Sequence, residues 1–147
     1  MDRTEAVITH FFNLLTNDNT LKSLMGGSVR LYHDDCPPET DFPYIIHRVE
    51  WRNVSDYSPK RLGTYIMDIY TNSLSTESML DIKERICSIL NNLTFSPGEV
   101  DSATIWIDSD RPIIEPEFSV KHYNILFNLK VVKLADVVGT INRMDTY

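Results

Sequence analysis

Apolar residues recur at helical spacing in two parts of the chain. The first part has a wide apolar face made of Val7, Ile8, Phe11, Phe12, Leu14 and Leu15, which predicts a helix. Asp2 and Glu5 have the spacing of a capping box at its start. A second stripe follows Ser75, a suitable N-cap residue, and it consists of Met79, Ile82, Ile86, Ile89, Leu90 and Leu93. Charged residues occupy the other side of this segment, so the pattern predicts one long amphipathic helix.

Five shorter runs, rich in β-branched and aromatic residues, predict strands. They are Val29–Tyr32, Tyr44–Trp51, Thr64–Tyr70, Thr104–Ile107 and Lys121–Val132. The last run alternates, with one face made of Tyr123, Ile125, Phe127, Leu129 and Val131, as expected for an antiparallel strand with one solvated face. Two polar stretches, Asn53–Arg61 and Ser109–Pro116, are interpreted as loops. Helices and strands are segregated, which predicts an α+β fold: a mostly antiparallel β-sheet with an N-terminal helix and one long amphipathic helix packed on one face.

Length and charge narrow the class of protein. The 147 residues fit one domain, assigned to residues 1–132, and residues 133–147 are left as an unassigned C-terminal tail. A net charge of −7 is the wrong balance for stable binding to DNA or to an anionic membrane, because phosphate binding relies on Lys and Arg. No signal peptide or membrane-spanning apolar run is predicted. We therefore expect a soluble protein made in the cytoplasm, with Cys36 and Cys87 reduced.

The segment from His33 to Cys36 is the candidate for chemistry. A zinc site needs three or four converging ligands, and four adjacent residues in one loop cannot all point at one ion. Cys36 would act as a nucleophile only with a base such as His47 or His122 within hydrogen-bond reach, and the sequence leaves this open. The common nucleotide-binding, hydrolase and metalloprotease motifs are absent. We therefore predict no catalytic residue, no cofactor and no metal.

The remaining ionisable residues have plainer interpretations. Asp68 lies in an apolar strand and is expected on the solvent face of the sheet, or paired with Arg48 or Lys130 on a neighbouring strand. The histidines, which are His10, His33, His47 and His122, are expected to be surface or sheet-face residues. Pro37-Pro38 stiffens the loop after the first strand, and Pro43 starts the next strand at a position where a missing donor is tolerated.

The succession of these elements resembles a known family. The stretch "LKSLMGGSVRLYHDDCPPETDFPYIIHRV" resembles the N-terminal half of the tail terminator, or tail-completion, proteins of tailed bacteriophages. Its matching features are a glycine turn, a short strand, a proline loop and Pro43-Tyr44 opening a long strand. The later segments "YIMDIYT", "ESMLDIKERICSILNNL" and "HYNILFNLKVV" also fit. The resemblance covers roughly Thr4 to Val132 and lies in the order of the elements rather than in any single residue.

The resemblance implies a virion protein of the tail or neck. Such a subunit would form a hexameric ring that caps the tail tube, stops its polymerisation and joins it to the head or neck. Its partners would be further copies of itself, the tail tube protein and a head-completion or connector protein, and DNA would pass through without specific binding. The candidate contact residues are Trp51, Arg52, Tyr57, Arg61, Arg111, Glu115 and Glu117, because aromatic and Arg side chains favour interfaces. Trp51 is equally well placed to be a core residue.

Two other interpretations stay open. The chain could be another small ring protein of the neck, such as a head-completion factor. A different class altogether is a small cytoplasmic enzyme or ligand-binding domain that uses the His33–Cys36 loop. The acidic balance of the chain fits a ring that lets DNA slide through it, although the same charge also serves ordinary solubility.

Overall fold

The computed structural model describes residues 3–53, 60–72, 76–98, 101–117 and 119–133. In chain order the elements are α1 Arg3–Thr16, α2 Asn19–Leu24, β1 Leu31–His33, β2 Tyr44–Asn53, β3 Lys60–Thr71, α3 Thr76–Leu90, β4 Leu93–Phe95, β5 Asp101–Ile113 and β6 Lys121–Lys133. The Asp2 capping position, the Ser75 N-cap and residues 134–147 lie outside the described residues. Within the described part, no helix has the length and apolar character needed to cross a membrane.

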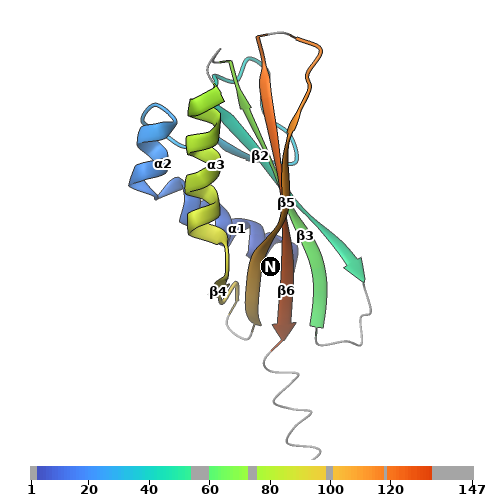
Figure 1. Cartoon of the computed structure of the whole chain (residues 1–147). Coiled ribbons are helices and arrows are strands. Elements are labelled where there is room, and N and C mark those ends of the chain that lie inside the picture. The colour runs from blue at the N-terminus through green and yellow to red at the C-terminus, as the bar shows by residue number, and fades with distance from the viewer. Residues whose placement is uncertain (1–2, 54–59, 73–75, 99–100, 118, 134–147) are drawn as a thin grey trace, which may run out of the picture.

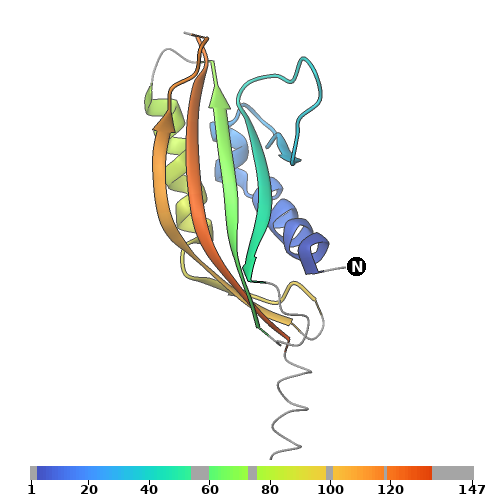
Figure 2. The same cartoon turned by 90° about the vertical axis from the view of Figure 1, so that its right-hand side faces the viewer.

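The strands form one twisted, six-stranded sheet in the order β1-β2-β3-β6-β5-β4, curled into a half-barrel (Figure 1). All neighbouring pairs are antiparallel except β1 and β2, which run parallel. The sheet is therefore mixed, although mostly antiparallel. The three helices lie on one face of the sheet, and no helix covers the opposite, outer face in the described chain (Figure 2). An α+β architecture results.

The core lies between the helices and the inner face of the long strands. The alternation predicted for β6 is confirmed, since Ile125, Phe127, Leu129 and Val131 are fully buried. Aromatic side chains join the layers: the Phe11 ring of α1 lies 4.3 Å from the Tyr65 ring of β3 and 4.9 Å from the Phe95 ring of β4, measured between centroids. From α3, the core receives Met79, Ile82, Ile86 and Leu90.

Three details differ from the predicted elements. Phe12 is 43% exposed and faces away from the core, so the apolar face of α1 is narrower than predicted. Leu93 does not continue α3 but starts β4, after a turn in which Asn92 has a positive φ of 62°. The predicted strand Thr104–Ile107 is far longer, because β5 continues to Ile113.

The extension of β5 corrects the assignment of Ser109–Pro116 as a loop. Residues Ser109 to Ile113 pair with β6 after a bulge at Ile107/Ser109. Pro112 is accommodated because β4 pairs only with Ala103–Ile105, so the other side of β5 needs no backbone donor at this point. Apolar alternation did not predict this part of β5, because it contains polar residues and a proline.

The acid- and proline-rich loop between β1 and β2 is held by one arginine. The Arg30 guanidinium donates to the carbonyl oxygens of Met25 at 2.8 Å, Phe42 at 3.2 Å and Pro43 at 2.9 Å. It also donates to the carbonyl of Asp41 at 3.1 Å. These bonds join the end of α2, at Met25, to the last residues of the loop and fix where β2 begins. The loop is thus a structural connection tied down by a single side chain.

Gly63 on β3 marks a close approach. A Cβ atom at this position would lie 2.7 Å from Cε3 of Trp51 and 3.0 Å from the carbonyl oxygen of Glu50. The indole therefore lies directly against the backbone of the neighbouring strand. Glycine is required here for space, and it fixes the position of Trp51 at this end of the sheet.

Candidate assembly surface

The described residues among the predicted contacts fall at two opposite ends of the sheet. Trp51, Arg52 and Arg61 lie where β2 ends and β3 begins, beside the last residues of β6. The other group consists of Arg111, Glu115 and Glu117, around the β5–β6 hairpin. Tyr57 lies outside the described residues. The structure therefore divides one predicted set into two separate surfaces.

At the first end, the Trp51 side chain is bound within its own chain. Its Nε1 donates to the hydroxyl of Thr4 on α1 at 2.8 Å, and its ring packs against the core. The Arg61 guanidinium lies 4.2 Å from the centre of that ring, a cation–π arrangement. Arg52 points to the outer face, where it donates to the Gly63 carbonyl at 3.1 Å and to Oδ1 of Asn128 at 2.9 Å. This end is a rigid aromatic and basic corner.

At the second end, three predicted residues have different environments. Arg111 is exposed on β5, within the segment that the sequence indicated as a loop. Glu117 is exposed after the strand, and its carbonyl accepts a 3.2 Å hydrogen bond from the Val120 amide. Glu115 is only partly exposed, because its carboxylate is bound by His122. Glu115 is therefore already paired within the subunit.

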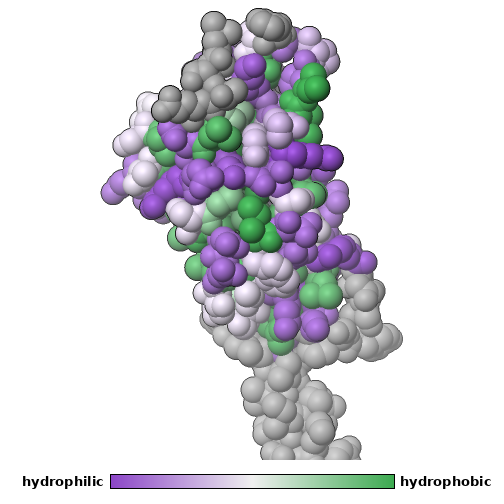
Figure 3. Space-filling view, in the orientation of Figure 1, coloured by the Kyte–Doolittle hydropathy of each residue, from purple (hydrophilic) through white to green (hydrophobic). Residues whose placement is uncertain are grey.

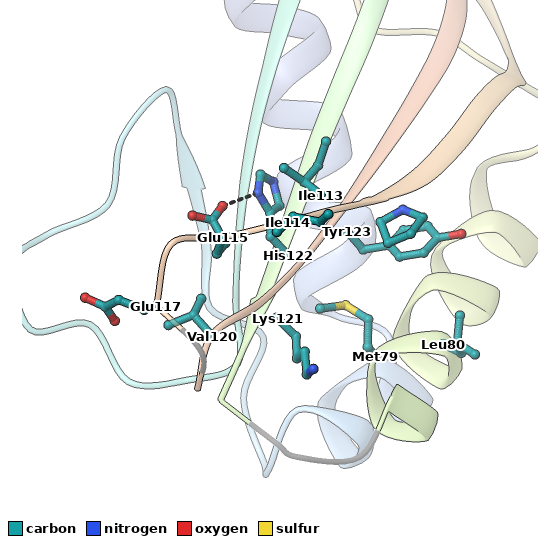
Figure 4. A pocket seen from close by; sticks show the side chains of 11 residues that line it. Met79, Leu80, Ile113, Ile114, Glu115, Glu117, Val120, Lys121, His122 and Tyr123 are labelled. Atoms are coloured by element: carbon teal, nitrogen blue, oxygen red, sulfur yellow. Dashed lines mark hydrogen bonds and ion pairs between the residues drawn. The ribbon is translucent and has the colours of Figure 1, made fainter.

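His122 is held between two carboxylates on the outer face of the sheet. Its Nδ1 lies 2.6 Å from Oε1 of Glu115 (Figure 4). Its Nε2 lies 2.7 Å from Oδ1 of Asp68 on β3. The Tyr70 ring stacks on the imidazole at 4.2 Å. Since ionised carboxylates only accept hydrogen bonds, both ring nitrogens donate and the ring is an imidazolium. This His122 clamp fastens the end of β5 to β3 across β6.

The clamp corrects the predicted partners of Asp68. Asp68 lies on the outer face as expected, but it binds His122 and Asn124, with the Asn124 amide donating at 2.9 Å. Lys130 is paired in register with Leu62, far along the strand. Arg48 forms its ion pair with Glu50 at 3.5 Å, and its charge acts on Asp68 only as a smaller contribution that lowers the Asp68 pKa. Only the strand register brings these groups together, so periodicity along the chain gave no signal for the clamp.

The pKa values of the clamp follow from its contacts. Burial by itself lowers the pKa of His122, but the hydrogen bonds to Asp68 and Glu115 outweigh it, so the pKa is raised above its usual value. Burial by itself raises the pKa of Asp68, and the hydrogen bonds from His122 and Asn124 bring it below its usual value. The contacts of the clamp therefore favour the charged forms of both His122 and Asp68.

We expect alkaline pH to weaken this end of the sheet. Because the His122 pKa is raised on folding, its stabilisation is complete below the unfolded-state pKa near 6.5 and is lost as pH rises through the folded value. The loss should be about 1.5 kcal/mol, the scale of a charge-assisted hydrogen bond. Urea unfolding between pH 6 and 10 measures it. His122→Gln should remove the pH dependence of the unfolding free energy, and His33→Gln, at an exposed position, should retain it. The same pH dependence in both variants would contradict the clamp.

An apolar groove lies beside the clamp, between the start of α3 and the β5–β6 hairpin (Figure 4). It has a volume of about 460 Å³, and its apolar lining comes from Met79, Leu80, Pro112, Ile113, Ile114, Val120 and Tyr123. Glu115, Glu117, Lys121 and His122 form its polar part. Ile114 is 98% exposed and Leu80 is 43% exposed. Hydrophobic side chains also gather over this hairpin at the upper right of Figure 3.

The His33–Cys36 loop gathers no catalytic arrangement among the described residues. His47 is fully buried, and its Nδ1 lies 2.6 Å from the Tyr65 hydroxyl, within hydrogen-bond distance. Burial lowers the pKa of His47 to about 3, so it is a neutral core residue and a poor base. Its predicted position on a sheet face is confirmed, but that face is the core side. No group of three or more potential metal ligands comes together in the part of the chain that the structure describes.

Comparison with known proteins adds information on the fold. No protein family and no curated protein matches the sequence. A chain from the structure described as the virion of a native gene transfer agent particle is similar, with a TM-score of 0.71 and 12% identity over 82% of this chain and 90% of that chain. A second solved structure has a TM-score of 0.62 and 12% identity, covering 86% of this chain and 94% of its own. At such identity the similarity concerns the fold.

Proposed function

We propose that this protein is a structural component of a phage-like virion. The observation that carries the proposal is the fold shared with a chain of a gene transfer agent particle over 82% of the present chain. The order of elements that resembles phage tail terminators supports the same class. A non-enzymatic role agrees with a neutral, buried His47, which is a poor base for Cys36.

More specifically, we infer that the chain is a tail terminator. It would form a hexameric ring that caps the tail tube, stops its polymerisation and contacts the head or neck. Closed rings are made by heterologous contacts, in which two different surfaces of each subunit meet. The two ends of this sheet offer such a pair: a basic and aromatic corner at Trp51 and Arg61, and an exposed apolar groove at Ile114. The net charge of −7 suits a ring that DNA passes without binding.

The oligomeric state tests this proposal. We expect a ring mass of about 102 kDa by light scattering, six times the 17.0 kDa of one chain, either alone or on purified tail tubes. Arg111→Glu, at an exposed position beside the groove, should lower the fraction of rings about tenfold or more, the scale of a strong interface residue. Lys22→Glu on α2 makes the same charge change outside both groups of predicted contact residues and should leave ring formation unchanged.

Virion assembly separates a terminator from another neck protein. Particles lacking a functional terminator should carry tails of uncontrolled length in electron micrographs. Tails of normal length that fail to join heads would instead favour the head-completion role. A protein that stays monomeric in solution and on tail tubes, or an Arg111→Glu variant that assembles normal virions, would contradict the proposed contact surface.

A further inference from the structure

We propose that the groove between α3 and the β5–β6 hairpin binds residues 134–147 of a second copy of this chain. The inference rests on the self-assembly in the proposed function and names the surface and the segment that would link one copy to the next. Four observations support it: the exposure of the groove, the pattern of the segment, one complementary charge pair and the distance between the two.

The groove is an apolar surface without a partner in the described chain. Only three large hydrophobic side chains among the described residues are strongly exposed, and two of them, Leu80 and Ile114, belong to it. They lie on two elements, α3 and the hairpin, that diverge and leave about 460 Å³ between them. Exposed apolar surface of this kind marks interaction sites. A partner that fills it needs an apolar face of its own.

Residues 134–147 have such a face in their sequence. Their larger apolar residues are Leu134, Val137, Val138, Ile141 and Met144, at spacings of three and four. This spacing predicts a helix with one apolar side. Binding of an amphipathic helix in a hydrophobic groove is a common mode of recognition, with anchors at i, i+4 and i+7. Leu134, Val138 and Ile141 have that spacing.

One charge pair fixes the direction of the segment. Asp145 follows Ile141 by four residues and thus continues the apolar side of the predicted helix. Lys121 lines the groove, and no acidic partner is seen for it among the residues that the structure describes. An Asp145 carboxylate at the end of the helix would meet Lys121 once Ile141 lies against Ile114.

The distance favours a second copy over the same chain. Lys133 ends β6, whereas the groove residues Lys121 and Tyr123 are at its start. The ten residues from Tyr123 to Lys133 span about 34 Å. If residues 134–147 fold as the predicted helix, it would be about 21 Å long. Such a helix would fall short of the groove of its own chain, so we assign it to the groove of another copy.

Cross-linking between two differently marked copies tests the inference. Full-length Ile114→Cys and Ile141→Cys proteins are mixed, oxidised and separated on non-reducing gels. We expect a disulfide-linked dimer that contains one copy of each. Phe12→Cys, at the other strongly exposed apolar position, replaces Ile114→Cys in the control and should give at least tenfold less dimer. Each single variant alone, which retains Cys36 and Cys87, gives the background.

A charge exchange provides a second readout. Lys121→Glu and Asp145→Lys should each raise the dissociation constant of self-association at least threefold, and combining both should restore it. Absence of the mixed dimer, or a disulfide formed only within an Ile114→Cys/Ile141→Cys double variant, would overturn the inference. Rings that form without the mixed dimer would leave the proposed function intact. If the mixed dimer forms but no closed ring is found, the groove contact would be supported and the proposed ring would be wrong.

Discussion

Lowering the pH from 7 to 4 is expected to destabilise the fold by about 3 kcal/mol through His47 alone. The imidazole projects from β2 into the core, where it is fully buried, and its Nδ1 is hydrogen-bonded to the Tyr65 hydroxyl of β3 at 2.6 Å. Burial lowers the pKa of His47 to about 3, with a smaller contribution from the charge of His33. Protonation inside this core would require an unpaired charge, so the folded protein excludes the proton.

The direction follows from the two pKa values. The unfolded chain binds a proton near pH 6.5 and the folded chain only near pH 3. Stability is therefore unaffected above pH 6.5, falls as pH decreases through this window, and levels off below the folded value. At pH 5 the loss is about 2 kcal/mol on the same basis.

Urea unfolding at several pH values, followed by circular dichroism, measures this effect. His47→Gln keeps a neutral polar side chain beside Tyr65 and should remove most of the loss between pH 6.5 and 4, even though the variant starts from a lower stability at pH 7. His33→Gln at an exposed position should leave the loss nearly unchanged. A His47→Gln variant with the same acid dependence as the parent would show that other groups carry it.

Arg30→Met is expected to cost about 3 kcal/mol of folding free energy. The substitution keeps an apolar stem of similar length but leaves the carbonyls of Met25, Phe42 and Pro43 without their donor. Hydrogen bonds to a charged group contribute about 1.5–3 kcal/mol each, and the contributions of one side chain overlap. Loss of the donor also frees the loop that positions Tyr44, the first residue of β2.

Arg30→Lys distinguishes the geometry of the guanidinium from its charge. One ammonium cannot reach both the Met25 carbonyl at the end of α2 and the carbonyls of Phe42 and Pro43 before β2, so we expect less than half of the lost stability to return. Thermal unfolding gives the comparison, and hydrogen exchange at the Ile45 amide, which donates to the Arg30 carbonyl at 2.8 Å, reports the loop locally. Arg48→Met, on the outer face with a single 3.5 Å ion pair, is the matched control and should cost under about 0.5 kcal/mol. Equal losses at both positions would contradict the role of Arg30.

The strands that the sequence predicted well are those whose alternation matches their burial. Tyr65, Met67 and Ile69 on β3 are fully buried, and each pairs in register with a buried or partly buried residue of β6. Strand β5 was underestimated because its second half has one inner position occupied by Asp110, which binds Lys83 at 2.8 Å and the Tyr123 hydroxyl at 2.9 Å. A polar residue satisfied by partners from α3 and β6 looks like a loop residue until those partners are known.

The candidate surface was predicted only in part, for a related reason. Side-chain type identified Arg111 and Glu117 as exposed residues but could not reveal that Glu115 is bound by His122. The pairing needs both the β3–β6 register and the return of the chain after β5. The sequence also could not predict that β1 runs parallel to β2. This pairing depends on the path of the loop between the two strands, whose end is bound by Arg30. Contacts between segments distant in sequence decide all of these features.

The short end strands β1 and β4 leave both edges of the sheet partly uncovered. β1 and β4 pair with only three residues each, Ile45–His47 of β2 and Ala103–Ile105 of β5. Beyond them, the described parts of β2 and β5 present backbone donors and acceptors along one side, a template for uncontrolled aggregation. Arg48, Glu50 and Pro112 on these lengths place charge and a missing donor where edge-to-edge pairing would begin. These residues therefore disfavour edge-to-edge aggregation of the chain through the uncovered lengths of β2 and β5.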